Sequence, residues 1–301
     1  MKIGLIDVDK SNKFPNLALM KISAYYKNKG DVVEFYSPMF GGMYDIVYVS
    51  KIFDYSLDYL YPINSKKIVY GGVGYDLKNK LPKKIENTYP DYNLYNFVGD
   101  NTAYGFLTRG CPRGCSFCNV TENQGKISKK VANLSDFWNG QKKIVLLDPN
   151  ILASSDWNEL FQQLIDSKSW VDFTQGLDIR LLDNEKIEML NKIKTKSIHF
   201  SWDNAKDKVI ENKFKEVRKN LLFRDRELIV YVLSNFDTTI EEDLYRIVKL
   251  SKMGYTPYLM IFDKDKLPRG HSLKKMQRLI NNRFIYRSIV LDLEKKLREV
   301  I

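Results

Sequence analysis

Some segments of this chain have the short apolar runs of β-strands, and others have apolar residues at the helical spacing of three to four. The two kinds of segment alternate along the chain. In the first third, short apolar runs have the length and composition of strands, and one segment, Asn16–Lys29, has apolar residues at helical spacing and ends near Gly30. The strand-like runs are Lys2–Ile6, Val32–Tyr36, Ile46–Val49 and Lys67–Tyr70. This alternation predicts a small doubly wound α/β domain over residues 1–95.

The same alternation starts again after residues 75–102, a stretch with many turn residues and no sustained period. The strand-like segments are Ala103–Thr108, Lys143–Leu147, Val171–Thr174, Ser197–Trp202, Leu228–Leu233 and Pro257–Phe262. The helix-like segments are Trp157–Lys168, Asn184–Lys194, Asp207–Asn220, Thr239–Met253 and Ser272–Asn282. Residues 119–142 are the least regular, with a short helix expected at Ser135–Asn139. About six βα units result, fewer than the eight that close a βα barrel.

These patterns predict a second domain over residues 96–283 and a helical tail over 284–301. The tail carries an apolar stripe on a charged helix, which we expect to dock against the second domain. The stripe consists of Ile285, Ile289, Leu293 and Leu297.

The net charge of +11 comes mostly from lysines mixed with acids, as in Lys186–Lys196 and Glu211–Arg226. Such mixed segments are typical of a solvated surface, and no arginine-rich block favours nucleic acid. No apolar run reaches the length of a membrane span, and the N-terminal run Met1–Asp7 has no cleavage site of a signal peptide. The chain is therefore expected in the cytoplasm, without a membrane partner.

The three cysteines of the chain stand within eight residues, at Cys111, Cys115 and Cys118. Their odd number excludes a complete disulfide framework. Structural zinc usually takes four protein ligands, and the two histidines, His199 and His271, lie far away in sequence. Zinc at the cysteines would make the chain a zinc-stabilised nucleic-acid-binding module, which is the alternative to an enzyme with an iron–sulfur cluster. A [4Fe–4S] cluster held by three thiolates would keep one iron open for a small molecule.

The spacing C-x3-C-x2-C with Phe117 before the last cysteine resembles the signature loop of the radical SAM superfamily. The resemblance implies that the cysteines hold a [4Fe–4S] cluster and that S-adenosylmethionine chelates the open iron. Reductive cleavage then gives a 5′-deoxyadenosyl radical that abstracts hydrogen from a substrate, which the sequence does not identify. It also implies a partial (βα)6 barrel with the cluster loop after its first strand. An acidic electron donor of flavodoxin or ferredoxin type would suit the positive charge.

Polar residues after the predicted second and third strands are the candidates for binding S-adenosylmethionine, because active sites of parallel βα folds lie at the carboxyl ends of strands. Asp178 and Arg180 could contact a ribose hydroxyl and a carboxylate, or form a structural ion pair. Asp148-Pro-Asn150 stands where many radical SAM members have a Gly-Gly-Glu-type motif, so Asp148 or Asn150 would replace its contact to the amino group. The candidate cofactor-binding residues are Phe117, Asp148, Asn150, Gln175, Asp178 and Arg180. No catalytic residue is assigned, and His199 is interpreted as a packed histidine.

The first domain resembles the cobalamin-binding domains that precede the barrel in one radical SAM branch. Those domains often carry a histidine that ligates cobalt, whereas residues 1–102 contain no histidine. We therefore expect a degenerate domain that binds no cobalamin, with a cobalamin-dependent radical SAM methylase as the runner-up. The three cysteines leave none for a second cluster, which argues against methylthiotransferases and against members with cysteine-rich extensions.

Overall fold

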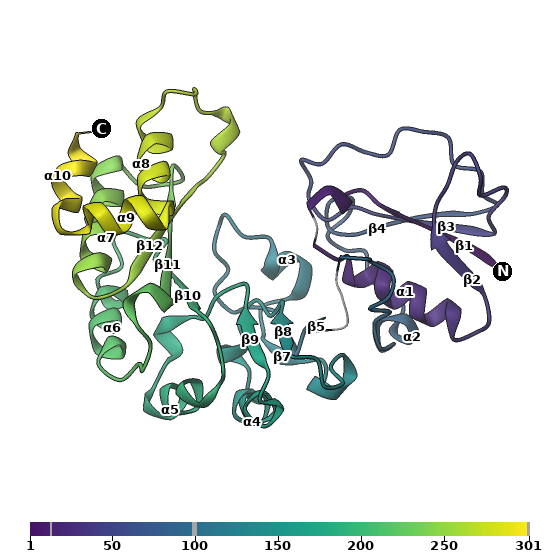
Figure 1. Cartoon of the computed structure of the whole chain (residues 1–301), viewed down its shortest axis with the longest axis horizontal. Helices are drawn as coiled ribbons and strands as arrows, with labels where there is room; N and C mark the ends of the chain where they lie inside the picture. Colours follow the sequence, from purple (N-terminus) through teal and green to yellow (C-terminus); the bar gives the residue numbers. More distant parts are fainter. Residues whose placement is uncertain (13, 98–100, 300–301) are drawn as a thin grey trace. The chain divides into compact units, whose positions relative to one another are not determined.

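The computed structural model describes residues 1–12, 14–97 and 101–299, which form two compact units. The first unit ends at Val145 and the second begins at Leu146. The boundary predicted near residue 95 falls inside the first unit and stays a prediction, as does the boundary near residue 283. Figure 1 shows the elements of both units, which are mixed α/β with parallel sheets.

The first unit contains a parallel sheet with the strand order β2-β1-β3-β4. Its strands are β1 (Lys2–Asp7), β2 (Val32–Phe35), β3 (Ile46–Ser50) and β4 (Ile68–Gly71). In the register, Ile3 faces Val33 on one side and Ile46 on the other. The predicted strands are confirmed, and β1 lies in the interior of the sheet.

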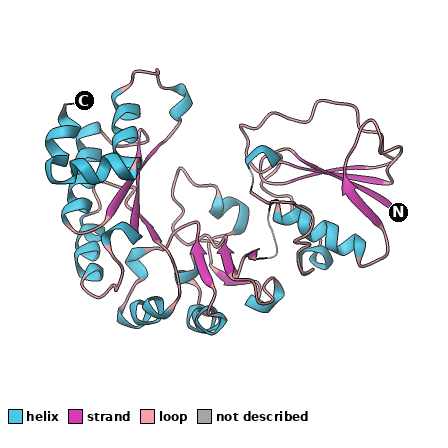
Figure 2. Ribbon diagram, in the orientation of Figure 1, coloured by secondary structure: helices cyan, strands magenta, loops and turns pink. Residues whose placement is uncertain are grey.

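Helices α1 (Leu17–Lys27) and α2 (Lys83–Glu86) cover one face of this sheet, as Figure 2 shows. Leu19 and Ile85 pack there in one buried cluster with Ile3. On the other face, Tyr44 and the loop residue Tyr59 pack with β3 in place of a helix. The parallel sheet agrees with the predicted α/β class, but the expected double winding is incomplete. Helices α1 and α2 cover one face, and a loop covers the other because residues 51–67 lack a helical period.

A short two-stranded sheet in the first unit leads into the cysteine loop. The predicted strand Ala103–Thr108 is divided into β5 (Thr102–Gly105) and β6 (Thr108–Arg109), and β6 pairs antiparallel with β7 (Lys129–Lys130). Gly105 lies against the Phe137 ring, where a Cβ would come within 2.4 Å of the ring. A side chain at this position would therefore displace the Phe137 ring.

The boundary between the units falls within β8 (Lys143–Leu146). In the first unit, the Lys143 amide donates to the Asn101 carbonyl at 2.9 Å, beside β5. In the second unit, the Thr174 amide donates to the Leu146 carbonyl at 3.2 Å, at the end of β9 (Trp170–Phe173). The strand order of this sheet is β5-β8-β9.

The second unit contains a parallel sheet of β10 (Ile198–Ser201), β11 (Leu228–Ser234) and β12 (Thr256–Ile261). One face is buried, with Phe200, Val230 and Leu259 almost inaccessible to solvent. The helices of the unit up to residue 281 match the predicted ones within a few residues. They are α4 (Trp157–Ser167), α5 (Asn184–Lys192), α6 (Lys208–Arg218), α7 (Ile240–Lys252) and α8 (Ser272–Asn281).

The tail forms α9 (Arg283–Ile289) and α10 (Leu293–Arg298). Leu293 and Leu297 are buried, and α10 contacts α7. The Tyr286 hydroxyl donates to Ser251 Oγ of α7 at 2.9 Å. The predicted docking of the tail is thus confirmed within the second unit. Among the described residues, no helix is both long enough and apolar enough to span a bilayer.

Candidate functional site

The cysteine loop lies between β6 and α3 (Val120–Gln124), a short helix that the sequence did not predict. Gly110 has φ of +94°, and a Cβ there would lie 2.2 Å from the Ile127 carbonyl oxygen. Gly114 also has a positive φ, +59°, with open space around it. The Cys111 amide donates to the Gly125 carbonyl at 3.1 Å. The loop is therefore fixed at its start and turns on glycine inside.

The three thiols reach the surface to different extents. Cys118 is exposed, Cys111 and Cys115 are half-buried, and none forms a disulfide. Within the described part of the chain, no three His, Cys, Asp or Glu side chains are gathered as a metal site. The donor set still fits an iron–sulfur cluster, because three thiols stand on one accessible loop with glycines that permit it to turn.

Arg109, just before the loop, is held by contacts with its own unit. Its Nη2 donates to Glu86 Oε1 of α2 at 3.1 Å, and its guanidinium lies 3.8 Å from the centre of the Phe106 ring. These contacts anchor the base of the cysteine loop.

In the second unit, three of the predicted cofactor-binding residues come together. Arg180 Nε donates to Asp178 Oδ1 at 2.8 Å, and Asn150 Nδ2 donates to Asp178 Oδ2 at 3.4 Å. Asp207 lies 3.8 Å from the other side of the Arg180 guanidinium. Asp178 also accepts the Arg180 amide and so caps a short 3₁₀ helix. The pair thus has a structural role, while a third of the Arg180 side chain stays accessible.

The other predicted site residues differ in their exposure to solvent. Asp148 is buried after β8, and Phe117 is partly exposed in the cysteine loop of the first unit. Gln175 is exposed and lines a cavity of about 1050 Å³ in the second unit, together with His199.

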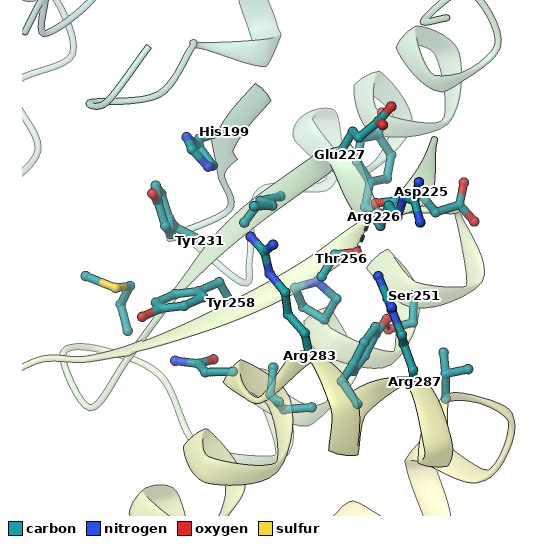
Figure 3. A pocket seen from close by; sticks show the side chains of 18 of the residues that line it. His199, Asp225, Arg226, Glu227, Tyr231, Ser251, Thr256, Tyr258, Arg283 and Arg287 are labelled. Atoms are coloured by element: carbon teal, nitrogen blue, oxygen red, sulfur yellow. Dashed lines mark hydrogen bonds between the residues drawn. The ribbon is translucent and has the colours of Figure 1, made fainter. Parts of the chain in front are cut away.

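His199 is more than a packed histidine, because it belongs to the wall of this cavity (Figure 3). Its ring stacks on Tyr231 at 5.4 Å between centroids, and Tyr231 meets Tyr258 edge-on at 5.7 Å. Burial lowers the pKa of His199, and the nearby Asp172 carboxylate only partly opposes this. The imidazole is therefore neutral near pH 7.

The cavity also brings in residues that the sequence did not single out, above all Arg283 and Arg287 of α9. Their spacing of four residues on a predicted helix is visible in the sequence. What the sequence could not show is that α9 faces the strands carrying Tyr231 and Tyr258, because that depends on tertiary docking of the tail.

Comparison with known proteins gives one partial similarity. The chain is 32% identical over 94 residues to a CDK5RAP1-like protein of Oryza sativa subsp. japonica. The match covers 29% of this chain and only 15% of the length of that protein. No family model matches the chain.

Proposed function

We propose that this protein is a radical SAM enzyme of the cytoplasm. The observation that carries the proposal is the C-x3-C-x2-C spacing with Phe117, on a loop that is fixed at Gly110 and accessible at its thiols. The partial similarity to the CDK5RAP1-like protein supports the same superfamily.

The order of the strands supports the partial (βα)6 barrel that this function requires. The strands of the two sheets follow in chain order, β5-β8-β9 and β10-β11-β12. Within the second unit, the Leu177 amide donates to the His199 carbonyl at 2.7 Å, and Val171 bridges to Thr195 in parallel, so β9 and β10 are neighbours. Six strands in chain order, each followed by helical or loop segments, are the arrangement of such an open barrel.

In this proposal, Cys111, Cys115 and Cys118 hold a [4Fe–4S] cluster. When bound, the iron–sulfur cluster would supply the electron for reductive cleavage of S-adenosylmethionine to methionine and a 5′-deoxyadenosyl radical. The side chains of Asp178 and Arg180 offer a carboxylate and a guanidinium to the polar groups of S-adenosylmethionine. Asn150 fixes the orientation of the Asp178 carboxylate.

The positive surface favours an acidic reductase partner, such as a flavodoxin or a ferredoxin. Complementary charge mainly raises association rates and is screened by salt. We expect reduction of the cluster by flavodoxin to slow as ionic strength rises.

The decisive test is anaerobic reconstitution with iron and sulfide. The parent should bind about four irons, the content of one [4Fe–4S] cluster, and show broad visible absorption. With dithionite and S-adenosylmethionine it should release 5′-deoxyadenosine. Replacing the three cysteines by alanine should abolish both the absorption and the product.

Ser116→Ala is the matched control, because it changes the same loop without removing a thiol. It should keep the iron content and the spectrum. One tightly bound zinc in place of iron would support the zinc module instead, and a full cluster spectrum in the triple cysteine variant would refute the assignment.

A further inference from the structure

The cavity lined by Gln175 and His199 lies wholly within the second unit, between the open face of its sheet and α9 (Figure 3). Its volume is about 1050 Å³. Pockets that enclose small molecules typically measure about 300–1000 Å³. The cavity is therefore large enough for a nucleotide-sized ligand.

The acids of this cavity are already neutralised by residues outside it. Asp225 Oδ1 lies 2.6 Å from Arg218 Nη2, and Glu227 forms an ion pair with Arg224. Neither Arg218 nor Arg224 lines the cavity. The carboxylates of the wall therefore contribute little net negative charge to the interior.

The arginines of the cavity wall are less compensated, although Arg226 lies near enough to Glu227 to help lower the pKa of that carboxyl. Among the described residues, none of them makes a hydrogen bond or an ion pair with a protein group; they are Arg226, Arg283 and Arg287. The cavity thus carries an excess of positive charge from guanidinium groups that keep their donors available.

Arg283 and Arg287 are four residues apart on α9 and so lie on one side of the helix. Two like charges at this spacing disfavour the helix unless an anion lies between or above them. The Tyr286 hydroxyl holds α9 against Ser251 of α7, and Figure 3 shows both arginine side chains extending from α9 toward the sheet. Planar guanidinium groups presented together match the oxygens of a phosphate.

The opposite wall is aromatic. Tyr258 is 39% exposed on the open face of β12, and its neighbour Tyr231 stacks on His199. An accessible tyrosine ring is a stacking surface for a nucleic-acid base. The imidazole of His199 continues this aromatic surface, since its ring stacks on Tyr231 at 5.4 Å between centroids.

We propose that this cavity binds a nucleoside phosphate, with the base against Tyr258 and the phosphate between Arg283 and Arg287. An aromatic surface and a guanidinium pair on opposite walls correspond to the two chemical ends of such a molecule. Binding here does not require the iron–sulfur cluster, so its test is separate from that of the radical function.

The experiment is a calorimetric titration of the purified chain, at low salt and without S-adenosylmethionine, with AMP, GMP, CMP and UMP. At least one of them should bind saturably. The Arg283→Gln/Arg287→Gln variant should bind that nucleotide at least about tenfold more weakly, since each lost charge-assisted hydrogen bond is a large fraction of the affinity. Tyr258→Ala should weaken binding as well. Tyr258→Phe should bind the nucleotide like the parent, because the stacking surface is kept.

Arg278→Gln is the control, because it removes the same charge from an exposed residue of α8 outside the cavity wall. It should leave the affinity unchanged, and all variants should have the circular dichroism of the parent. The corresponding nucleoside and inorganic phosphate should each bind more weakly than the nucleotide.

Three results would overturn the proposal. The first is that none of the four nucleotides binds below about 10 mM, which is weaker than specific binding requires. The second is undiminished affinity in the double arginine variant. The third is inorganic phosphate binding as tightly as the nucleotide, which would indicate a simple anion pocket.

Discussion

Asp243 and Arg246 form an ion pair one turn apart on α7, with side chains that are 1% and 0% exposed. The Arg246 guanidinium also donates to the carbonyls of Asp203 at 2.9 Å and Leu233 at 2.8 Å. The Asp243 carboxylate accepts from Ser234 and Thr238. This network joins α7 to the ends of β10 and β11. Removing one of its groups leaves the buried partners of that group without a hydrogen bond.

Removing Arg246 should therefore destabilise the protein strongly. Arg246→Met leaves the buried Asp243 carboxylate without its cation and the carbonyls of Trp202, Asp203 and Leu233 without this donor, a loss of about 3–5 kcal/mol. Urea unfolding followed by circular dichroism measures it. Lys192→Met is the control, since it breaks the exposed i,i+4 pair with Glu188 and should cost less than about 1 kcal/mol. Equal effects of the two variants would contradict a structural role of the buried pair.

The start of the cysteine loop should tolerate no side chain at Gly110. Gly110→Ala adds a Cβ 2.2 Å from the Ile127 carbonyl oxygen at a positive φ, so the chain must move. We expect a lower iron content after anaerobic reconstitution and a lower melting temperature. In Gly114→Ala the new Cβ lies in open space, so the variant should lose only roughly 1 kcal/mol of stability, the cost of a left-handed backbone at a residue other than glycine. A Gly110→Ala protein with the full iron content of the parent would show that the loop start need not be fixed.

Asp178→Ala and Arg180→Ala should weaken binding of S-adenosylmethionine and keep the visible absorption of the cluster. Loss of hydrogen bonds to charged groups costs about 1.5–3 kcal/mol, which is at least tenfold in affinity. Equilibrium dialysis under anaerobic conditions measures the affinity. Lys213→Ala, which breaks an exposed pair with Glu216 on α6, is the control. If both site variants bind like the parent, the Asp178–Arg180 pair is purely structural.

His199 should make stability depend on pH in mildly acidic solution. Its folded-state pKa is lowered by burial, so below pH 6.5 the unfolded chain takes up a proton that the folded chain does not. The free energy of unfolding should then fall as the pH drops from 6.5, by at most about 1.4 kcal/mol per pH unit. Asp172 and Arg283 also face this ring, with opposite effects on its pKa.

Urea unfolding of the parent and of His199→Gln between pH 5 and 8 checks this slope. The slope of the variant should be flatter than that of the parent in the range below pH 6.5. Identical slopes in the parent and His199→Gln would show that the imidazole is not the titrating group.

The first unit should bind no cobalamin. Residues 1–102, which include the parallel sheet of this unit, contain no histidine and so offer no imidazole ligand for cobalt. After incubation with hydroxocobalamin and desalting, we expect no cobalt to be retained. Stoichiometric retention with a cobalamin spectrum would favour the methylase in place of the present proposal.

The long periodic segments were predictable from the sequence, and contacts between distant segments were not. The apolar pattern located β11 and α7 within a few residues because each is long and regular. It did not single out Asp243, a charged residue that the structure buries in α7 together with Ile247 and Leu250. The cavity could not be predicted, because Arg283 and Tyr258 line the same cavity only through the docking of α9.

Parallel pairing also determines how this chain must fold. In the first sheet, Ile3 pairs with Val33 and with Ile46, so β1 has no local partner and gains its contacts only after two long loops have closed. Closing loops costs chain entropy before the contacts compensate for it. Refolding of this sheet should thus be slower than that of a helical bundle of the same length. Until β3 arrives, β1 is an apolar strand with an open edge, and aggregation competes with folding in that interval.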